Sequence, residues 1–309
     1  MKFATLNISG RATPVVVSPD DTGFCPIERL LQDFRGDMPD LIARAPNPER
    51  DLPQVSSWTP LAGHRLLAPI PRPRRNIFCV GKNYHEHARE FAQSGFDTSA
   101  KKGEVAPEAP VVFTKAPSTV VADGDPVLSF AAITQQLDYE AELAVIIGTP
   151  GRGITRAAAL DHVWGYTIVN DVTARDLQQR HRQWFLGKSM DSFCPMGPAI
   201  VTAPEVGDPT NLAVRCWING ELRQDANTRD LIFDIPTIIE AISRGMTLEP
   251  GDVIANGTPA GVGIGFSPPR YPQARRHHED RDRQAWHAHE HGRTVSARRS
   301  RSPQLSARP

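Results

Sequence analysis

The fold is decided by the stretch Asp138-Tyr139-Glu140-Ala141-Glu142-Leu143-Ala144-Val145-Ile146-Ile147-Gly148. Its apolar second half predicts a β-strand. Side chains alternate between the two faces of a strand, so Glu140 and Glu142 are expected to project to the same side. Two carboxylates at that spacing repel each other unless a cation or a shared proton lies between them. The stretch therefore predicts a strand that holds a divalent metal ion near its beginning.

A third carboxylate extends this set. Asp171 follows the apolar segment 165–169, which is another expected strand, and a carboxylate at that position needs an exposed or liganded setting. Three carboxylates with open positions for water and substrate suit Mg²⁺ or Mn²⁺, which prefer hard oxygen ligands. The alternative is that Glu140 and Glu142 form the solvated face of an edge strand, and their spacing alone does not exclude it.

Segment 83–90 carries the second candidate group. On the short helix expected there, His87 and Glu90 are i, i+3 neighbours, so the carboxylate can orient the imidazole and raise its basicity. A water molecule held by such a pair beside a metal becomes a nucleophile at neutral pH. The alternative is an ordinary ion pair on the surface of a helix.

Two later segments carry further polar candidates. Lys188 lies in a loop bounded by proline, where its ammonium group could meet a substrate oxyanion or carboxylate, or could be an ordinary surface lysine. The glycine-rich segment 256–263 contains Thr258 and follows an expected strand. A phosphate loop is improbable because prolines at 268 and 269 prevent a following helix and no Gly-Lys-Ser/Thr ending is present. Two interpretations of this segment remain: a loop whose backbone N–H groups donate to a carboxylate, and a structural turn.

The order of expected elements predicts an α+β fold. Strands outnumber helices and alternate with them irregularly, which does not suit a doubly wound sheet. Further strands are expected at residues 76–81, 111–115, 198–202, 212–218 and 253–255, and helices at 27–34, 82–90, 174–184 and 235–243. The expected organisation is a small β-rich N-terminal domain (1–70), a catalytic domain (71–270) and a tail (271–309).

Taken together, these segments resemble the fumarylacetoacetate hydrolase family, in its acylpyruvase-like and fumarylpyruvate hydrolase-like branch. The resemblance covers about residues 74–269. It rests on six segments in family order: 80–90, 138–143, 170–176, 187–189, 219–224 and 257–263. It implies a mixed β-sandwich roll, a homodimer, and a site for Mg²⁺, with Mn²⁺ or Ca²⁺ as alternatives.

The resemblance also implies a role for individual residues. The implied metal ligands are Glu140, Glu142 and Asp171. The implied catalytic residues are His87 and Glu90, which would activate water, and Lys188, which would stabilise an oxyanion. The implied substrate-binding residues are Lys82, Gln178 and Thr258, and Lys82 stands where some family members carry arginine.

The implied activity is hydrolysis of a C–C bond in 2,4-diketo acids of the acylpyruvate or fumarylpyruvate type, through a metal-stabilised enolate. The same enolate can also arise by proton transfer or by loss of CO₂. An isomerase or decarboxylase acting on hydroxy-dienoates or oxaloacetate-like 2-oxo acids is therefore the alternative. A folded but inactive binding protein is a third interpretation, motivated by the aberrant end of the chain.

The tail differs from the rest of the chain. Residues 271–309 contain nine arginines, no lysine and four acids, with few apolar side chains. The resemblance stops at about residue 269, and we hypothesise a change of reading frame near residue 271. Histidines at 287, 289 and 291 could bind metal and the arginines could contact nucleic acid, but we expect a disordered tail instead.

Composition excludes several other classes of protein. The 309 residues include no apolar run of 18 residues and no visible secretory signal, so neither a membrane partner nor export is expected. The four cysteines lie far apart without metal-ligand spacing, which predicts reduced thiols. These features favour a cytoplasmic protein. The resemblance implies that its partner is a small-molecule 2-oxo or diketo acid, and we expect no nucleic-acid partner.

Overall fold

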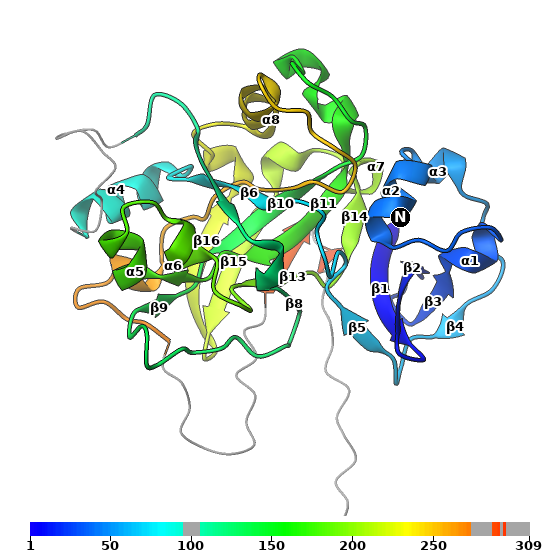
Figure 1. Ribbon diagram of the computed structural model, residues 1–309, viewed down its shortest axis with the longest axis horizontal. Coiled ribbons are helices and arrows are strands. Elements are labelled where there is room, and N and C mark those ends of the chain that lie inside the picture. Colours follow the sequence, from blue (N-terminus) through cyan, green and yellow to red (C-terminus); the bar gives the residue numbers. More distant parts are fainter. Residues whose placement is uncertain (95–105, 273–285, 291–292, 295–309) are drawn as a thin grey trace, which may run out of the picture.

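The computed structural model describes residues 1–94, 106–272, 286–290 and 293–294. A smaller lobe formed by the first 67 residues lies beside a larger body in which strands are covered by short helices (Figure 1). The strand predicted around residues 138–148 forms β10 (Ala141–Ile147), and it lies inside the largest sheet. Glu140 comes directly before this strand and Glu142 lies within it.

Thirteen strands of the described chain form one mixed sheet. Its main path runs in the order β4 (Thr59–Pro60), β3 (Gly23–Pro26), β2 (Arg11–Val17), β1 (Lys2–Ile8), β14 (Ile200–Thr202), β11 (Val163–Asn170), β10, β17 (Val253–Ala255), β6 (Ile77–Gly81) and β7 (Val111–Lys115). The remaining members are β5 (Arg65–Leu67) on β1, β13 (Cys194–Met196) on β11, and β8 (Val120–Ala122) on β13. The pairs β6–β17 and β8–β13 are parallel, and the other pairs are antiparallel.

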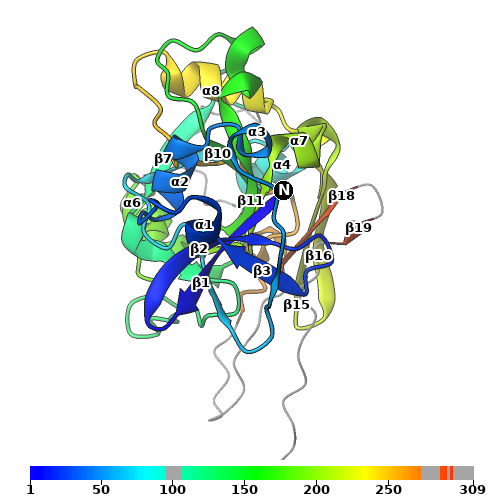
Figure 2. The same ribbon diagram turned by 90° about the vertical axis from the view of Figure 1, so that its right-hand side faces the viewer.

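Two smaller sheets and several short helices complete the described fold. One sheet pairs β9 (Leu137–Asp138) with β12 (Thr173–Ala174), and the other joins β16 (Glu221–Asn227), β15 (Ala213–Ile218), β18 (Trp286–Glu290) and β19 (Arg293–Thr294) (Figure 2). The α-helices are α1 (Ile27–Leu30), α2 (Met38–Arg44), α3 (Pro48–Asp51), α4 (His85–Gln93), α5 (Arg175–Arg180), α6 (Phe185–Lys188), α7 (Ala203–Val206) and α8 (Ile235–Ser243). This mixed sheet with helices confirms the predicted α+β class.

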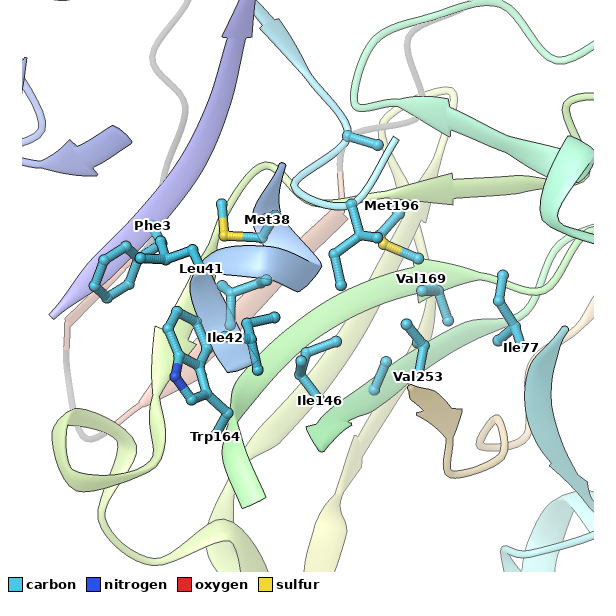
Figure 3. Packing of buried hydrophobic residues seen from close by; sticks show 14 of the residues in the cluster. Phe3, Met38, Leu41, Ile42, Ile77, Ile146, Trp164, Val169, Met196 and Val253 are labelled. Atoms are coloured by element: carbon cyan, nitrogen blue, oxygen red, sulfur yellow. The ribbon is translucent and has the colours of Figure 1, made fainter. Parts of the chain in front are cut away.

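Strand β10 is buried along its whole length because hydrophobic clusters cover both of its faces. Ala144 and Ile146 face one cluster, which includes Trp164 and Val253 and contacts the N-terminal lobe (Figure 3). Leu143, Val145 and Ile147 face the other cluster, which contains the apolar side of α8. The solvated edge strand considered for this stretch is therefore wrong.

The antiparallel pairing of β10 with β11 brings the three predicted metal ligands together. In this register Ala141 lies opposite Asn170 and Glu142 lies opposite Val169. The backbone N–H of Asp171 then donates to the carbonyl of Glu140 at 2.9 Å. Glu140 and Asp171, which are 31 positions apart in the chain, thus meet at one end of the strand pair.

The N-terminal lobe is joined to the body by a sheet and by a core. Strand β1 pairs with β14, and Phe3 packs against Trp164 with ring centroids 4.8 Å apart. The indole Nε1 of Trp164 donates to the carbonyl of Ala45, just after α2, at 2.8 Å. The domain boundary expected at residue 70 stays a prediction.

Three expected helices differ in extent from those observed. Helix α1 ends at Leu30, whereas the helix was expected to reach residue 34. Helix α4 begins at His85 because Lys82 has a φ of 56° and the Asn83 carboxamide bonds to the backbone of Phe233 and Asn256. The single helix expected at 174–184 is wrong: α5 ends at Arg180, a turn at residues 181–184 follows, and α6 begins at Phe185.

Most of the tail lies outside the described residues, so its expected disorder and its changed reading frame stay predictions. The backbone of β18 pairs with β15, and β19 pairs with β18. The structure holds one chain, so the homodimer also stays a prediction. None of the described helices combines the length and the apolar character that crossing a membrane requires.

Trp164 provides a test of how strongly the lobe and the body depend on each other. Trp164→Ala is expected to lower the free energy of unfolding by about 3–5 kcal/mol, because it removes a fully buried indole and its hydrogen bond. Urea unfolding measures this change. Trp58→Phe is the matched control, since Trp58 is 40% exposed and should change stability by less than about 0.5 kcal/mol. Equal effects of the two substitutions would contradict the shared core.

Candidate metal centre and active-site pocket

Three buried carboxylates form the centre of the candidate site. Glu140, Glu142 and Asp171 are 4%, 2% and 0% exposed, and each offers an oxygen atom within 4.8 Å of the oxygens of the other two. Among the described residues, this is the group of acidic, histidine or cysteine side chains that has the arrangement of a metal site. Its formal charge of −3 in a dry setting needs compensation by cations or protons.

Three buried cations surround these carboxylates. Lys188 Nζ donates to Glu140 Oε2 at 2.7 Å and to Asp171 Oδ2 at 2.6 Å. Lys115 Nζ donates to Asp171 Oδ1 at 2.6 Å and also to the carbonyl of Lys188. Arg175 Nη2 lies 2.7 Å from Glu140 Oε1. Every oxygen of Glu140 and Asp171 therefore has a cationic partner.

A fourth buried carboxylate ties this cluster to a loop. Asp138 accepts hydrogen bonds from Arg175 Nε at 2.9 Å and from the backbone N–H groups of Gly263 and Ile264 at 2.7 and 3.0 Å. Tyr139 beside it donates its hydroxyl to the carbonyl of Gly261 at 2.8 Å. Segment 261–264 is thus fastened to the start of β10 by buried polar contacts.

The two glutamates differ in protonation because their neighbours differ. Burial alone would raise the pKa of Glu140, but the charges of Lys188 and Arg175 outweigh it and lower that pKa to about 2. Burial and then the negative charges of Asp171 and Glu140 raise the pKa of Glu142 well above its ordinary value. The backbone N–H of Gly257 donates to Glu142 Oε2 at 2.8 Å, and this hydrogen bond offsets part of the rise in pKa. Glu142 is therefore the carboxylate that most lacks a cation.

The residues present fit a divalent metal ion. The donor set is all oxygen, as hard cations such as Mg²⁺ and Mn²⁺ prefer. The four carboxylates carry one more charge than Lys115, Arg175 and Lys188 together, and the raised pKa of Glu142 marks where the missing positive charge belongs. Glu140, Glu142 and Asp171 would hold the ion.

Gly257 donates its backbone N–H to Glu142 from a conformation that favours glycine. Its φ is +98°, which disfavours residues with a side chain. A Cβ there would lie 2.8 Å from both the Asn83 Cβ and the Val80 carbonyl oxygen. The loop is therefore a set of backbone donors for carboxylates, which is one of the two interpretations left open by its sequence.

His87 and Glu90 meet as the helix spacing predicts. Glu90 Oε2 lies 3.1 Å from His87 Nδ1, and Glu90 Oε1 accepts from the backbone N–H of Gly261 at 3.0 Å. His87 is 5% exposed, so the pair is not the surface ion pair considered as its alternative. A carboxylate at Nδ1 keeps the proton on that nitrogen and leaves Nε2 as the basic atom.

One pocket gathers most of the predicted site residues. It encloses about 300 Å³, part of it open to solvent. Its lining includes Lys82, His87, Glu140, Glu142, Gln178, Lys188 and Thr258. Glu90 and Asp171 are not part of this lining. Glu90 contacts His87, and Asp171 contacts Lys188.

The hydroxyl of Thr258 is already engaged within the protein. It donates to the carbonyl of Ala141 at 3.0 Å and accepts from Gln224 Nε2 at 2.7 Å. Gln178 accepts from Arg175 Nη1 at 3.2 Å through its carboxamide oxygen. Lys82 Nζ lies 5.6 Å from the centre of the Phe91 ring. Substrate-binding roles of these three residues stay predictions.

Sequence reasoning missed four residues that build the site. Lys115, Asp138 and Arg175 complete the charge cluster, and Trp184 lines the pocket. The sequence contained a signal for three of them. Lys115 ends an apolar strand, and Asp138 and Arg175 lie in segments 138–143 and 170–176, which were already singled out. The four cysteines are buried and free, as predicted.

Comparisons with known proteins show which proteins the chain resembles. The sequence pattern described as "Fumarylacetoacetate (FAA) hydrolase C-terminal" matches residues 76–299, and so extends past the expected boundary at residue 270. The chain is 54% identical to "Oxaloacetate tautomerase YisK" of Bacillus subtilis (strain 168) over 207 residues, which are 67% of this chain and 66% of the relative. The match thus spans slightly less than two thirds of that relative's length.

Two solved structures resemble most of the chain. "Fumarylacetoacetate hydrolase (EaFAH)" from psychrophilic Exiguobacterium antarcticum has a TM-score of 0.77 and 43% identity, covering 94% of this chain and 96% of that one. Maleylpyruvate hydrolase from Sphingobium sp. SYK-6, in complex with manganese(II) and pyruvate, has a TM-score of 0.66 and 33% identity, covering 85% and 90%.

The protonation of Glu142 predicts how Mn²⁺ affects stability at different pH. A group whose pKa is raised on folding stabilises the protein at low pH, and that contribution is lost as pH rises through the raised pKa. The protein without metal should therefore become less stable over the pH range that begins near 4.5, the ordinary pKa of a glutamate, and ends at the raised pKa of Glu142; Mn²⁺ can replace the proton over this range. Saturating Mn²⁺ should raise the melting temperature by roughly 5 °C or more at the high end of this pH range, and by less at its low end.

Two substitutions make this measurement specific. Glu142→Gln should remove most of the Mn²⁺ effect and its pH dependence, whereas Glu86→Gln on the exposed side of α4 should leave both unchanged. An equal Mn²⁺ effect at both ends of the pH range in the unsubstituted protein would count against the site.

Proposed function

The chain belongs to the fumarylacetoacetate hydrolase family, and on that premise we propose that it interconverts the enol and keto forms of oxaloacetate or a closely similar 2-oxo acid. The observation that carries this proposal is a buried carboxylate cluster beside a pocket that contains a basic histidine and a protonated lysine. The similarity to an oxaloacetate tautomerase supports this choice among the reactions open to such a site.

The charge of the cluster favours an anionic substrate. Four buried carboxylates stand against three buried cations, which leaves one negative charge. A divalent ion would turn this excess into one positive charge, and Lys82 adds another to the pocket lining. A 2-oxo dicarboxylate would compensate both charges.

Lys188 would act as a donor and not as a base. Burial alone would lower its pKa, but Asp171 and Glu140 outweigh burial and raise that pKa above the ordinary value. The ammonium group has three N–H bonds, of which two point to those carboxylates. The third is available to the 2-oxygen of a bound substrate, where negative charge develops when the enolate forms.

His87 would move the proton at the carbon next to the 2-oxo group. Its Nε2 is the basic nitrogen because Glu90 holds the proton on Nδ1. In the direction from enol to keto, the proton lost from the 2-hydroxyl would pass to Nε2, which would then deliver a proton to that carbon. No carbon–carbon bond breaks and nothing is consumed. When bound, a divalent ion supplies Lewis-acid stabilisation of the charge on the 2-oxygen and the adjacent carboxylate.

Hydrolysis of a C–C bond in acylpyruvates is the second candidate. The His87–Glu90 pair favours it, since the same Nε2 could take a proton from water and direct that water to a remote carbonyl. Lys188 would then stabilise the oxyanion. The similarity to a maleylpyruvate hydrolase structure supports this second reaction.

Loss of the oxaloacetate enol, followed by its ultraviolet absorbance, measures the proposed reaction. Purified protein with Mg²⁺ or Mn²⁺ should accelerate this loss without releasing pyruvate. His87→Asn should lower kcat by about 100-fold or more, because proton transfer by a positioned side chain contributes that much. His85→Asn is the matched control, since His85 is exposed on the same helix and should not change kcat.

Acetylpyruvate and fumarylpyruvate distinguish the two candidates. Cleavage of either compound at a rate above that of oxaloacetate tautomerisation would favour hydrolysis. No turnover of any of the three compounds by metal-loaded protein would refute both.

A further inference from the structure

Three aromatic rings form one wall of the pocket, and Trp184 stands between the other two. Its ring centroid lies 5.1 Å from that of Phe113 and 6.1 Å from that of Phe91, in edge-to-face arrangements. All three side chains line the pocket. The function proposed above assigns no role to this wall.

The aromatic wall lies close to the charged centre. Lys188 Nζ is 5.0 Å from the centroid of the Phe113 ring, and that ring contacts the indole of Trp184. The indole therefore lies within about 10 Å of the ammonium group, by adding the two distances. A carbon chain advances roughly 1.3 Å per bond, so only a short substrate fits between them.

Gly81 leaves room for the indole of Trp184 because it has no side chain. A Cβ at this position would be 2.3 Å from Cζ3 and 2.8 Å from Cη2 of Trp184. The edge of the indole thus occupies the space that a side chain at residue 81 would fill. Gly81 ends β6, which pairs with the strand that carries Phe113. Two strands of the central sheet therefore support the wall.

The chain also couples this wall to Lys188. Trp184 directly precedes α6, and the backbone N–H of Lys188 donates to the carbonyl of Trp184 at 3.0 Å. One turn of helix separates the indole from the ammonium group. A substrate whose 2-oxo end contacts Lys188 must extend along the aromatic wall or stop before it.

We propose that Trp184 determines substrate length and restricts this site to short 2-oxo acids, of the size of oxaloacetate. The inference rests on the proposed function for the site that binds the 2-oxo end. Longer acyl chains meet the indole edge, which packs against Phe91, Phe113 and Gly81. Trp184 is thus a specificity-determining residue.

Binding of a series of straight-chain 2-oxo acids, from pyruvate to 2-oxooctanoate, tests this inference without depending on turnover. The protein is loaded with Mn²⁺, and each acid is titrated by calorimetry. In the unsubstituted protein, affinity should fall by about tenfold or more once the chain exceeds the length of oxaloacetate. In Trp184→Leu this fall should disappear or move to longer chains.

Gly81→Ala should act in the opposite direction. The added methyl group would push the indole into the pocket, so the loss of affinity should begin at a shorter chain. Phe185→Ala is the matched control because Phe185 is the next residue, is 42% exposed and is absent from the pocket lining. It should keep the length profile of the unsubstituted protein.

The outcomes separate this inference from the proposed function. Identical length profiles for the unsubstituted protein and Trp184→Leu, both with normal Mn²⁺ binding, would overturn the inference. If Trp184→Leu does not fold, Trp184→Phe takes its place, and an unchanged profile there would overturn it equally. A profile that shifts as expected in a protein without tautomerase or hydrolase activity would support the length limit and refute the proposed function.

Discussion

The structure depends on the pairing of four buried carboxylates with three buried cations at one end of β10. Asp138, Glu140, Glu142 and Asp171 could not lie in this setting without compensation, because isolated buried charges are strongly unfavourable. Lys115 and Lys188 hold Asp171 between them, and Arg175 bridges Asp138 and Glu140. Glu142 alone has no cationic partner among the hydrogen bonds and ion pairs of the described residues, and this imbalance is the basis for a metal site.

Other parts of the fold are arranged around this cluster. The β10–β11 register places Asp171 beside Glu140, and the loop after β17 supplies backbone donors to Glu142, Asp138 and Glu90. The same loop thus holds both Glu142, one of the three predicted metal ligands, and the carboxylate that orients His87. A disturbance of this loop would change the metal centre and the proton-transfer group together.

The sequence could predict those parts of the site that follow from local periodicity. Alternation along a strand predicted that Glu140 and Glu142 project to the same side, and helix spacing predicted the His87–Glu90 contact. Lys115 could not be assigned in this way, since its contact with Asp171 joins residues 56 positions apart. The fit of Trp184 against Gly81 depends on the separate turn between α5 and α6, where a continuous helix was expected. Tertiary packing decides both features, and no local pattern reports them.

Diffraction from crystals grown with Mn²⁺, recorded to locate the ion by its anomalous signal, tests whether Glu140, Glu142 and Asp171 hold a metal ion. We expect one strong peak at roughly 2.0–2.2 Å from an oxygen of each of Glu140, Glu142 and Asp171. An ion bound elsewhere, with no peak between the three carboxylates and Lys188 still bridging Glu140 and Asp171, would contradict it.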